Sequence, residues 1–119
     1  MTRDIFEKHI FEKYGVMPEC PWARYPENRV FRHGDNKKWF ALTMTIPISK
    51  LGVDEDRAVD VVNLKLTEEV LDIALCDLGI FPAYHMNKTH WISVLLDGSV
   101  DSDIVKILLE NSFRATLKK

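Results

Sequence analysis

Apolar residues recur every three or four positions between residues 2 and 14. This spacing is typical of one face of an amphipathic helix. The residues on that face are Ile5, Phe6, Ile10 and Tyr14. Thr2 can accept a backbone N–H bond at the start of such a helix, and Gly15 can adopt the left-handed conformation that ends it. We therefore predict a first helix over residues 2–14.

Three later stretches alternate between apolar and polar residues, as strands do: residues 29–33, 38–46 and 59–66. A Gly-Asp-Asn segment at 34–36 separates the first two stretches, and these residue types tolerate the positive φ of a hairpin turn. Strict alternation divides the side chains between the two sides of the sheet. The side chains on the side that faces the core would be Phe40, Leu42, Met44, Ile46, Val62, Leu64 and Leu66. The opposite side would carry Trp39, Ala41, Thr43, Thr45, Val61, Asn63 and Lys65.

The second half of the chain predicts a helix, a strand and a final helix. Thr67 can cap the first of these helices and Gly79 can end it. Its predicted buried stripe consists of Val70, Leu71, Ala74, Leu75 and Leu78. A strand begins at Trp91, and an Asp-Gly-Ser turn at 97–99 leads into the last helix. The inner side of that helix is expected to hold Ile104, Ile107 and Leu108.

These elements follow the order α-β-β-β-α-β-α. Neighbouring strands without intervening helices favour an antiparallel sheet with helices packed on one face, which is an α+β fold. With 119 residues and 46% hydrophobic content, residues 1–119 suffice for a single domain that needs no disulfide or metal. Cys20 and Cys76 belong to no metal-binding pattern, so we expect reduced thiols and a cytoplasmic protein. No apolar run approaches the roughly 18 residues that cross a bilayer.

Charge is distributed unevenly, although the formal net charge is only −2. Residues 22–39 contain five basic and two acidic side chains, whereas acidic residues gather between positions 54 and 72. One face could therefore attract an anion while the whole protein stays acidic. The alternative interpretation is that both runs are ordinary solvated loops of opposite sign.

The predicted outer side of the sheet combines tryptophans with cations. We expect Trp39, Asn63, Lys65, Trp91 and Ser93 on this side, with Arg29 or Arg32 and His33 nearby. Indole rings can stack on nucleic-acid bases, and lysine or arginine can neutralise phosphates. In the alternative interpretation, a terminal helix covers this face and the tryptophans belong to a second core.

Residues 81–96, FPAYHMNKTHWISVLL, place His85, Lys88 and His90 in a polar turn before a strand. The histidines lack the third and fourth ligands of a structural zinc site. They either hold the turn by hydrogen bonds or form an anion-facing rim with Lys88, which is the better candidate because it is charged at neutral pH. The chain contains no nucleophile elbow and no glycine-rich phosphate loop, so we predict no catalytic site, no metal and no cofactor.

Three segments resemble the MmcQ/YjbR family: VFRHGDNKKWFAL at 30–42, VNLK at 62–65 and FPAYHMNKTHWISVLLDGSV at 81–100. They occur in the family's order, and the correspondence extends over nearly the whole chain. The resemblance implies a small cytoplasmic α+β domain of CyaY-like architecture, in which paired β-wings have been proposed as a "double wing" DNA-binding motif. It implies neither an enzymatic activity nor a cofactor.

Two classes of function remain open, and we expect a monomer in both. In the first, the domain binds nucleic acid, DNA above all, through phosphate and shape contacts with little sequence preference. The candidate residues are Arg29, Arg32, His33, Lys37, Lys38, Trp39, Lys65, His85, Lys88, His90 and Trp91. In the second, the domain is an adaptor that binds a protein or a small ligand in a groove on the tryptophan-bearing face of the sheet.

Overall fold

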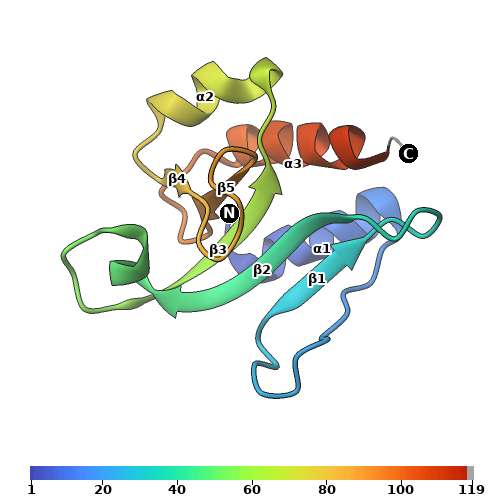
Figure 1. Ribbon diagram of the computed structural model, residues 1–119, viewed down its shortest axis with the longest axis horizontal. Helices are drawn as coiled ribbons and strands as arrows, with labels where there is room; N and C mark the ends of the chain where they lie inside the picture. The colour runs from blue at the N-terminus through green and yellow to red at the C-terminus, as the bar shows by residue number, and fades with distance from the viewer. Residues whose placement is uncertain (118–119) are drawn as a thin grey trace.

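Five antiparallel strands form one sheet, and two long helices lie on the same side of it (Figure 1). The computed structural model describes residues 1–117. The helical elements are α1 (Arg3–Tyr14), the 3₁₀ turns η1 (Ile48–Leu51) and η2 (Glu68–Val70), α2 (Leu71–Cys76) and α3 (Ser102–Leu117). The strands are β1 (Arg29–Arg32), β2 (Trp39–Pro47), β3 (Ala58–Lys65), β4 (Ile80–Pro82) and β5 (Trp91–Leu95). The predicted α+β fold class, with an antiparallel sheet and helices on one face, is confirmed.

The strands lie in the order β1-β2-β3-β5-β4, and neither edge of the sheet is an open, long strand. Glu19 and Val30 exchange two backbone hydrogen bonds of 2.9 and 2.8 Å, which covers part of the β1 edge. At the other edge, β4 has three residues and ends in Pro82, which has no N–H to donate. The alternation pattern did not predict β4, because so short a segment forms by pairing with β5 and shows no pattern of its own.

A β-bulge at Phe40 reverses the alternation along β2. Arg32 pairs with Trp39 and Phe31 pairs with Ala41, so Phe40 is the extra residue. Its carbonyl accepts a hydrogen bond of 2.6 Å from the Ser112 hydroxyl of α3, which satisfies the group that the bulge leaves unpaired.

The bulge corrects the predicted assignment of the two sheet faces. Phe40 packs on the helix side, but Leu42, Met44 and Ile46 lie on the opposite side in a second apolar cluster. The prediction that these four residues share one core face is therefore wrong. The sheet buries apolar residues on both faces.

The helix-side core joins α1 and α3 to the sheet. Phe6 and Ile10 of α1 and Val105, Leu108 and Leu109 of α3 are fully or almost fully buried. They share one cluster with the sheet residues Phe31, Phe40, Ala41, Val62, Leu64, Ile92 and Val94. Each large side chain in such a cluster contributes roughly 1.5–3 kcal/mol of burial free energy. Ile5 and Ile107, which were predicted to face inward, are about half exposed and flank this core.

An aromatic and ionic contact fastens the end of α1 to α3. The Tyr14 ring stacks on Phe113 at 3.9 Å between centroids, and its hydroxyl donates a hydrogen bond to the Glu110 carboxylate. Hydrogen bonds from Tyr14 and Arg114 and the charge of Lys13 lower the pKa of Glu110 to about 2. Burial and the Glu110 carboxylate raise the pKa of Tyr14, so its hydroxyl remains a donor at neutral pH.

The low pKa of Glu110 predicts a loss of stability in acid. Because the folded state lowers this pKa from 4.5 to about 2, its stabilising contribution is complete above pH 4.5 and disappears as the pH falls towards 2. We expect Glu110→Gln to show a smaller drop in unfolding free energy than the wild-type protein between these pH values, measured by urea denaturation. The exposed Glu68→Gln variant is the control and should follow the wild-type curve. Identical curves for Glu110→Gln and wild type would contradict the assignment.

The helix predicted for residues 67–79 is shorter than expected. The Thr67 hydroxyl donates to Asn111 Oδ1 at 2.8 Å and makes no capping bond, and α2 spans only Leu71–Cys76. Gly79 does not end a helix. Gly79 instead packs closely against Val100, in the turn before α3. A Cβ on Gly79 would lie 2.5 Å from Cγ2 of Val100. Leu75 and Leu78, which were assigned to the buried stripe, are 75% and 96% exposed.

Candidate functional site

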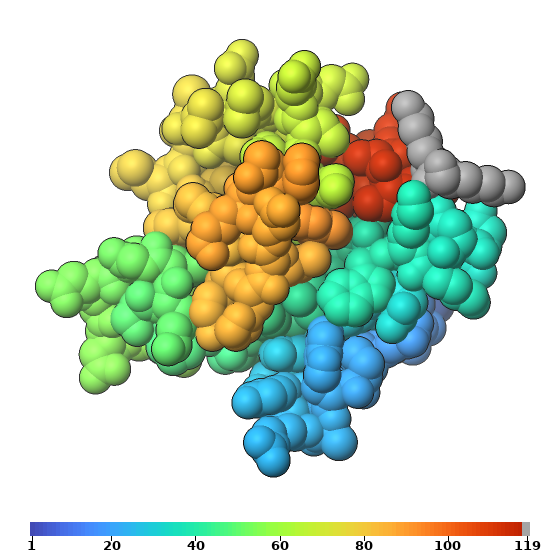
Figure 2. Space-filling model, in the orientation of Figure 1, coloured from blue at the N-terminus to red at the C-terminus, as the bar shows by residue number. Residues whose placement is uncertain are grey.

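Two loops cover much of the sheet face that points away from α1 and α3. The loop at 15–28 runs along the β1 edge of this face and the loop at 83–90 lies over its middle, as Figure 2 shows in blue and orange. Beneath them lies the second apolar cluster: Val30, Leu42, Met44, Ile46, Ile48, Val59, Val61 and Leu95. The sheet face is therefore neither an open platform nor a face covered by a terminal helix.

The 15–28 loop is held by its backbone and by Trp22. Turns close from Tyr25 N to Trp22 O and from Asn28 N to Tyr25 O, each at 3.0 Å. The Trp22 ring packs edge-on against Trp39, with 5.8 Å between centroids. Arg3 of α1 donates a hydrogen bond to the Glu27 carbonyl from the helix side. These contacts fix the loop so that Trp22 and Tyr25 form a wall above the sheet.

The 83–90 loop is anchored by buried polar side chains of β3 and β5. Asn63 donates to the Tyr84 carbonyl at 2.8 Å and accepts a bond of 2.5 Å from the Ser93 hydroxyl. Ser93 in turn accepts a bond of 3.0 Å from Tyr84 N–H. Asn63 and Ser93 have no exposed surface, so the network fixes the loop where it crosses the sheet. His85 takes a left-handed conformation with φ of 65° at the start of the exposed part.

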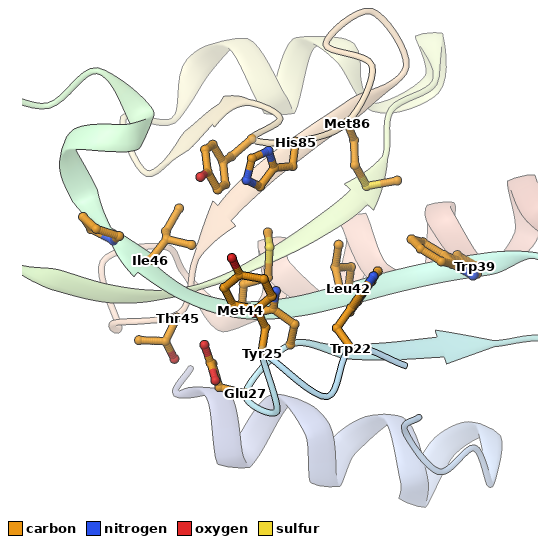
Figure 3. Close-up of a pocket in the computed structure, with 13 residues that line it drawn as sticks. Trp22, Tyr25, Glu27, Trp39, Leu42, Met44, Thr45, Ile46, His85 and Met86 are labelled. Atoms are coloured by element: carbon orange, nitrogen blue, oxygen red, sulfur yellow. The ribbon is translucent and has the colours of Figure 1, made fainter. Parts of the chain in front are cut away.

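A groove of about 490 Å³ runs between the two loops (Figure 3). Its floor is apolar and consists of Leu42, Met44 and Ile46 of β2. We define the sheet groove by its lining residues: Trp22, Tyr25, Glu27, Asn28, Trp39, Leu42, Met44, Thr45, Ile46, Pro47, Tyr84, His85 and Met86. The groove is thus mainly aromatic and aliphatic, with few polar side chains at its rim.

A second hollow of about 410 Å³ adjoins the sheet groove. Trp39 and Met86 line both hollows, so the two are neighbours across these side chains. We call the second hollow the lysine end, and its lining consists of Lys38, Trp39, Lys65, Met86, Trp91, Ala115 and Thr116. The Lys65 ammonium lies 5.3 Å from the centre of the Trp91 ring, within cation–π range.

The structure brings together part of the predicted site. Trp39, Lys65 and Trp91 share the sheet side that alternation assigned to them, and Lys38 joins them at the lysine end. Arg32 also lies on this side, with its guanidinium 5.6 Å from the Trp39 ring and its Nε 3.2 Å from a Glu19 carboxylate oxygen. His85 lines the sheet groove, whereas Lys37, Lys88 and His90 are exposed on the hairpin and the 83–90 loop.

Two candidate residues lie elsewhere. Arg29 is on the helix side, where it pairs with Glu7 of α1. His33 is 3% exposed, and its Nε2 lies 2.7 Å from the Thr116 hydroxyl between the Phe40 and Phe113 rings. Burial lowers the pKa of this imidazole. The expectation that His33 lies beside the tryptophan face is therefore wrong, because His33 follows Phe31 by two residues and so points to the same side of the sheet, towards α3.

Sequence reasoning missed most of the groove's walls and floor. Trp22 and Tyr25 were not among the candidate residues, and Tyr84 and Met86 received no binding role. Leu42 and Met44 were assigned to the other face. The signal that could have found the loop residues is the concentration of aromatic side chains between the prolines at 18, 21 and 26.

The described residues, 1–117, contain no group of three or more His, Cys, Asp or Glu side chains placed to hold a metal ion. Cys20 and Cys76 are both exposed and are not joined in a disulfide. In this same part of the chain, no helix has the length and apolar character needed to cross a membrane. The groove therefore offers shape, aromatic surface and flanking cations as its means of recognition.

The fold and groove define a small α+β domain with a covered, hollowed sheet face. Comparisons with known proteins identify the family to which this domain belongs. The family model YjbR matches residues 11–115, and the chain belongs to this family. A Bacillus subtilis (strain 168) protein, "Uncharacterized protein YyaQ", is 40% identical over 116 residues, which covers 98% of each chain.

Solved structures support the same architecture. A crystal structure of a Pseudomonas syringae protein is 45% identical, covers 98% of this chain and 99% of its own, and superposes with a TM-score of 0.92. A crystal structure of Deinococcus radiodurans protein DR2400 is 27% identical, covers 99% of this chain and 80% of its own, and has a TM-score of 0.69. The family resemblance carried by residues 30–42, 62–65 and 81–100 is thus confirmed.

Proposed function

We propose that this protein is a small-ligand-binding domain and that the sheet groove holds an organic ligand. The observation that carries the proposal is a groove of about 490 Å³ with an apolar floor and aromatic walls. Ligand sites typically have volumes of about 300–1,000 Å³ and are lined mainly by apolar side chains with a few polar groups. The groove has this size and composition.

The way the walls are held also favours a small ligand. Both loops are fixed by hydrogen bonds independent of any occupant, so binding would cost little ordering entropy. A protein partner that added a strand would need a free sheet edge, and the Glu19–Val30 pairing and Pro82 limit both edges. We propose binding without catalysis, because no hydrogen bond between the described side chains joins a lining hydroxyl to His85 or Glu27, and the Thr45 hydroxyl bonds Asp60 and Arg3 instead.

Nucleic acid is the second candidate, and the lysine end is the observation that favours it. Lys38 and Lys65 flank Trp39 and Trp91, which would let a base stack while phosphates meet the ammonium groups. Lys37 and Lys88 lie exposed on the turn between β1 and β2 and on the 83–90 loop. Anisotropy of labelled single-stranded and duplex DNA at two salt concentrations tests this candidate, and binding should weaken as salt increases.

The sheet groove itself is tested with 2-naphthamide, a neutral bicyclic aromatic compound. We expect Tyr25→Ala to weaken its binding roughly three- to ten-fold, because one aromatic contact is worth about 0.5–1.5 kcal/mol. Tyr25 is 51% exposed, so its removal should leave the fold intact. Isothermal titration calorimetry measures the affinity.

Phe11→Ala is the matched control for this experiment. Phe11 is 53% exposed on α1, on the other side of the sheet, so the two variants remove similar aromatic surface. The control should bind 2-naphthamide like the wild-type protein. Equal losses in both variants, or no binding by the wild type, would contradict the proposed function.

A further inference from the structure

The sheet groove carries a negative charge at the end away from Trp39. Glu27 lies at that end together with Thr45 (Figure 3). Within residues 1–117, no ion pair involves the Glu27 carboxylate, and the lining of the groove includes neither lysine nor arginine. An exposed carboxylate is ionised at neutral pH, so this end of the groove attracts a cation and repels an anion.

The charges behind Glu27 do not cancel its charge. The Arg3 guanidinium lies 3.0 Å from the Glu7 carboxylate and 3.9 Å from the Asp60 carboxylate. Arg29 pairs with the same glutamate. Because these two arginines and two carboxylates balance one another, the negative charge of Glu27 remains for a ligand.

The backbone around Glu27 is fixed independently of any ligand. The Glu27 carbonyl accepts a hydrogen bond from the Arg3 guanidinium, and Asn28 N–H donates to the Tyr25 carbonyl at 3.0 Å. The ring of Pro26 restricts the backbone between them. These contacts hold the carboxylate at the rim of the groove, and none of them uses the Glu27 side chain.

Aromatic rings in the groove offer a second means of holding a cation. Trp22 and Tyr25 of the 15–28 loop and Tyr84 of the 83–90 loop line the groove. Indole and phenol rings attract a cation that lies within about 6 Å of the ring centre. The Trp39 ring already has such a contact, because the Arg32 guanidinium lies 5.6 Å from its centre. Repulsion by this guanidinium would direct a second cation away from Trp39 and towards the other rings.

We propose that the ligand of the sheet groove is an organic cation, in which an aromatic ring carries a positively charged nitrogen group. The nitrogen group lies at Glu27, and the ring lies beside Trp22 on the floor formed by Leu42 and Met44. This inference rests on the proposed function and adds charge and orientation to it. An anion in the same position would be repelled by the Glu27 carboxylate.

Three compounds of the same shape and different charge test the proposal. At neutral pH, 2-naphthamidine is a cation, 2-naphthamide is neutral and 2-naphthoate is an anion. Isothermal titration calorimetry at low salt should show that the cation binds about three- to ten-fold more tightly than the amide, because it gains an ion pair and a cation–π contact. The anion should bind less tightly than the amide. Both differences should shrink as salt is added.

Charge variants of Glu27 locate the preference. Glu27→Gln should reduce the ratio of cation affinity to amide affinity at least two-fold. Glu27→Lys should make the anion bind more tightly than the cation, and this gain shows that the variant is folded. Glu12→Gln is the matched control, because Glu12 is exposed on α1, on the other side of the sheet, and the change in net charge is the same. The control should keep the full ratio.

The outcomes distinguish this inference from the proposed function. If 2-naphthamide binds and 2-naphthamidine binds no more tightly, the sheet groove remains a ligand site and the cationic class is overturned. A ratio that Glu27→Gln leaves unchanged, or that Glu12→Gln reduces equally, would also overturn the inference, because the preference would then arise elsewhere. If none of the three compounds binds, the proposed function itself falls.

Discussion

Replacing Arg3 with methionine is expected to lower the free energy of unfolding by about 3 kcal/mol, the lower end of the range for breaking a buried ion pair. Arg3 is 8% exposed on α1. Its guanidinium lies 3.0 Å from the Glu7 carboxylate and donates to the Thr45 and Thr43 hydroxyls at 2.9 and 3.2 Å. Methionine fills similar space but leaves these acceptors without their donor.

The neighbouring carboxylate makes the effect large. Burial raises the pKa of Glu7, yet hydrogen bonds from Thr43, Arg3 and Arg29 outweigh burial and hold the pKa below its usual value. Glu7 is therefore charged in the folded protein. Without Arg3, its remaining partners among the described residues are Arg29 and Thr43.

Urea denaturation followed by circular dichroism measures the loss. Arg114→Met is the matched control, because Arg114 also pairs with a glutamate four residues away but its side chain is 75% exposed. Such exposed pairs contribute about 0.3–0.5 kcal/mol. An Arg3→Met protein as stable as Arg114→Met would show that the Arg3 network carries little net stability. Arg3 also binds the Glu27 carbonyl, so its loss should loosen the 15–28 wall of the sheet groove.

Replacing Asn63 with alanine should cost about 3 kcal/mol of stability and abolish binding in the sheet groove. The change removes the donor to the Tyr84 carbonyl and the acceptor of the Ser93 hydroxyl, in a site with no exposed surface. Each buried group left unsatisfied costs about 1–3 kcal/mol. Tyr84 would lose its anchor, and the Tyr84–Met86 wall would no longer hold its position.

Asn87→Ala is the control within the same loop. Asn87 is exposed and accepts one bond of 2.8 Å from Thr89 N–H, so we expect a cost below about 1 kcal/mol. Thermal denaturation and titration with 2-naphthamide measure both effects. If Asn63→Ala bound the compound as tightly as Asn87→Ala, the wall would not depend on the buried network.

Much of the fold follows from local patterns. The first helix and the strands around residues 29–33, 38–46, 59–66 and 91–96 were predicted within a few residues of their observed bounds. The bulge at Phe40 was not predicted, because it depends on a carbonyl that Ser112 of α3 satisfies from far along the chain. That single extra residue moved Leu42, Met44 and Ile46 to the other face.

Other errors also have tertiary causes. Leu75 and Leu78 share the periodicity of a buried stripe, but α2 ends at Cys76 and its neighbours do not cover them. His33 looked like part of a basic hairpin, whereas its ring fits between Phe40 and Phe113. Sequence spacing does not reveal which loop or helix will cover a given side chain.

The candidate site was predictable where it lies on strands. Trp39, Lys65 and Trp91 share a side because cross-strand partners face the same way, and the Lys65–Trp91 pairing is direct. The walls formed by the two loops were not predictable. The positions of Trp22 and Met86 depend on irregular backbone, which has no repeating pattern that a sequence could reveal.

The most direct test of the central claim, that the sheet groove binds a ligand, is a nuclear magnetic resonance titration of the labelled protein with 2-naphthamide. The structure predicts that the largest shifts will fall on the methyl groups of Leu42, Met44 and Met86 and on the Trp22 and Trp39 indoles. Shifts confined to exposed apolar residues elsewhere, such as Leu75 and Leu78 or Phe11, would contradict the claim. The absence of any shift at millimolar concentrations would contradict it equally.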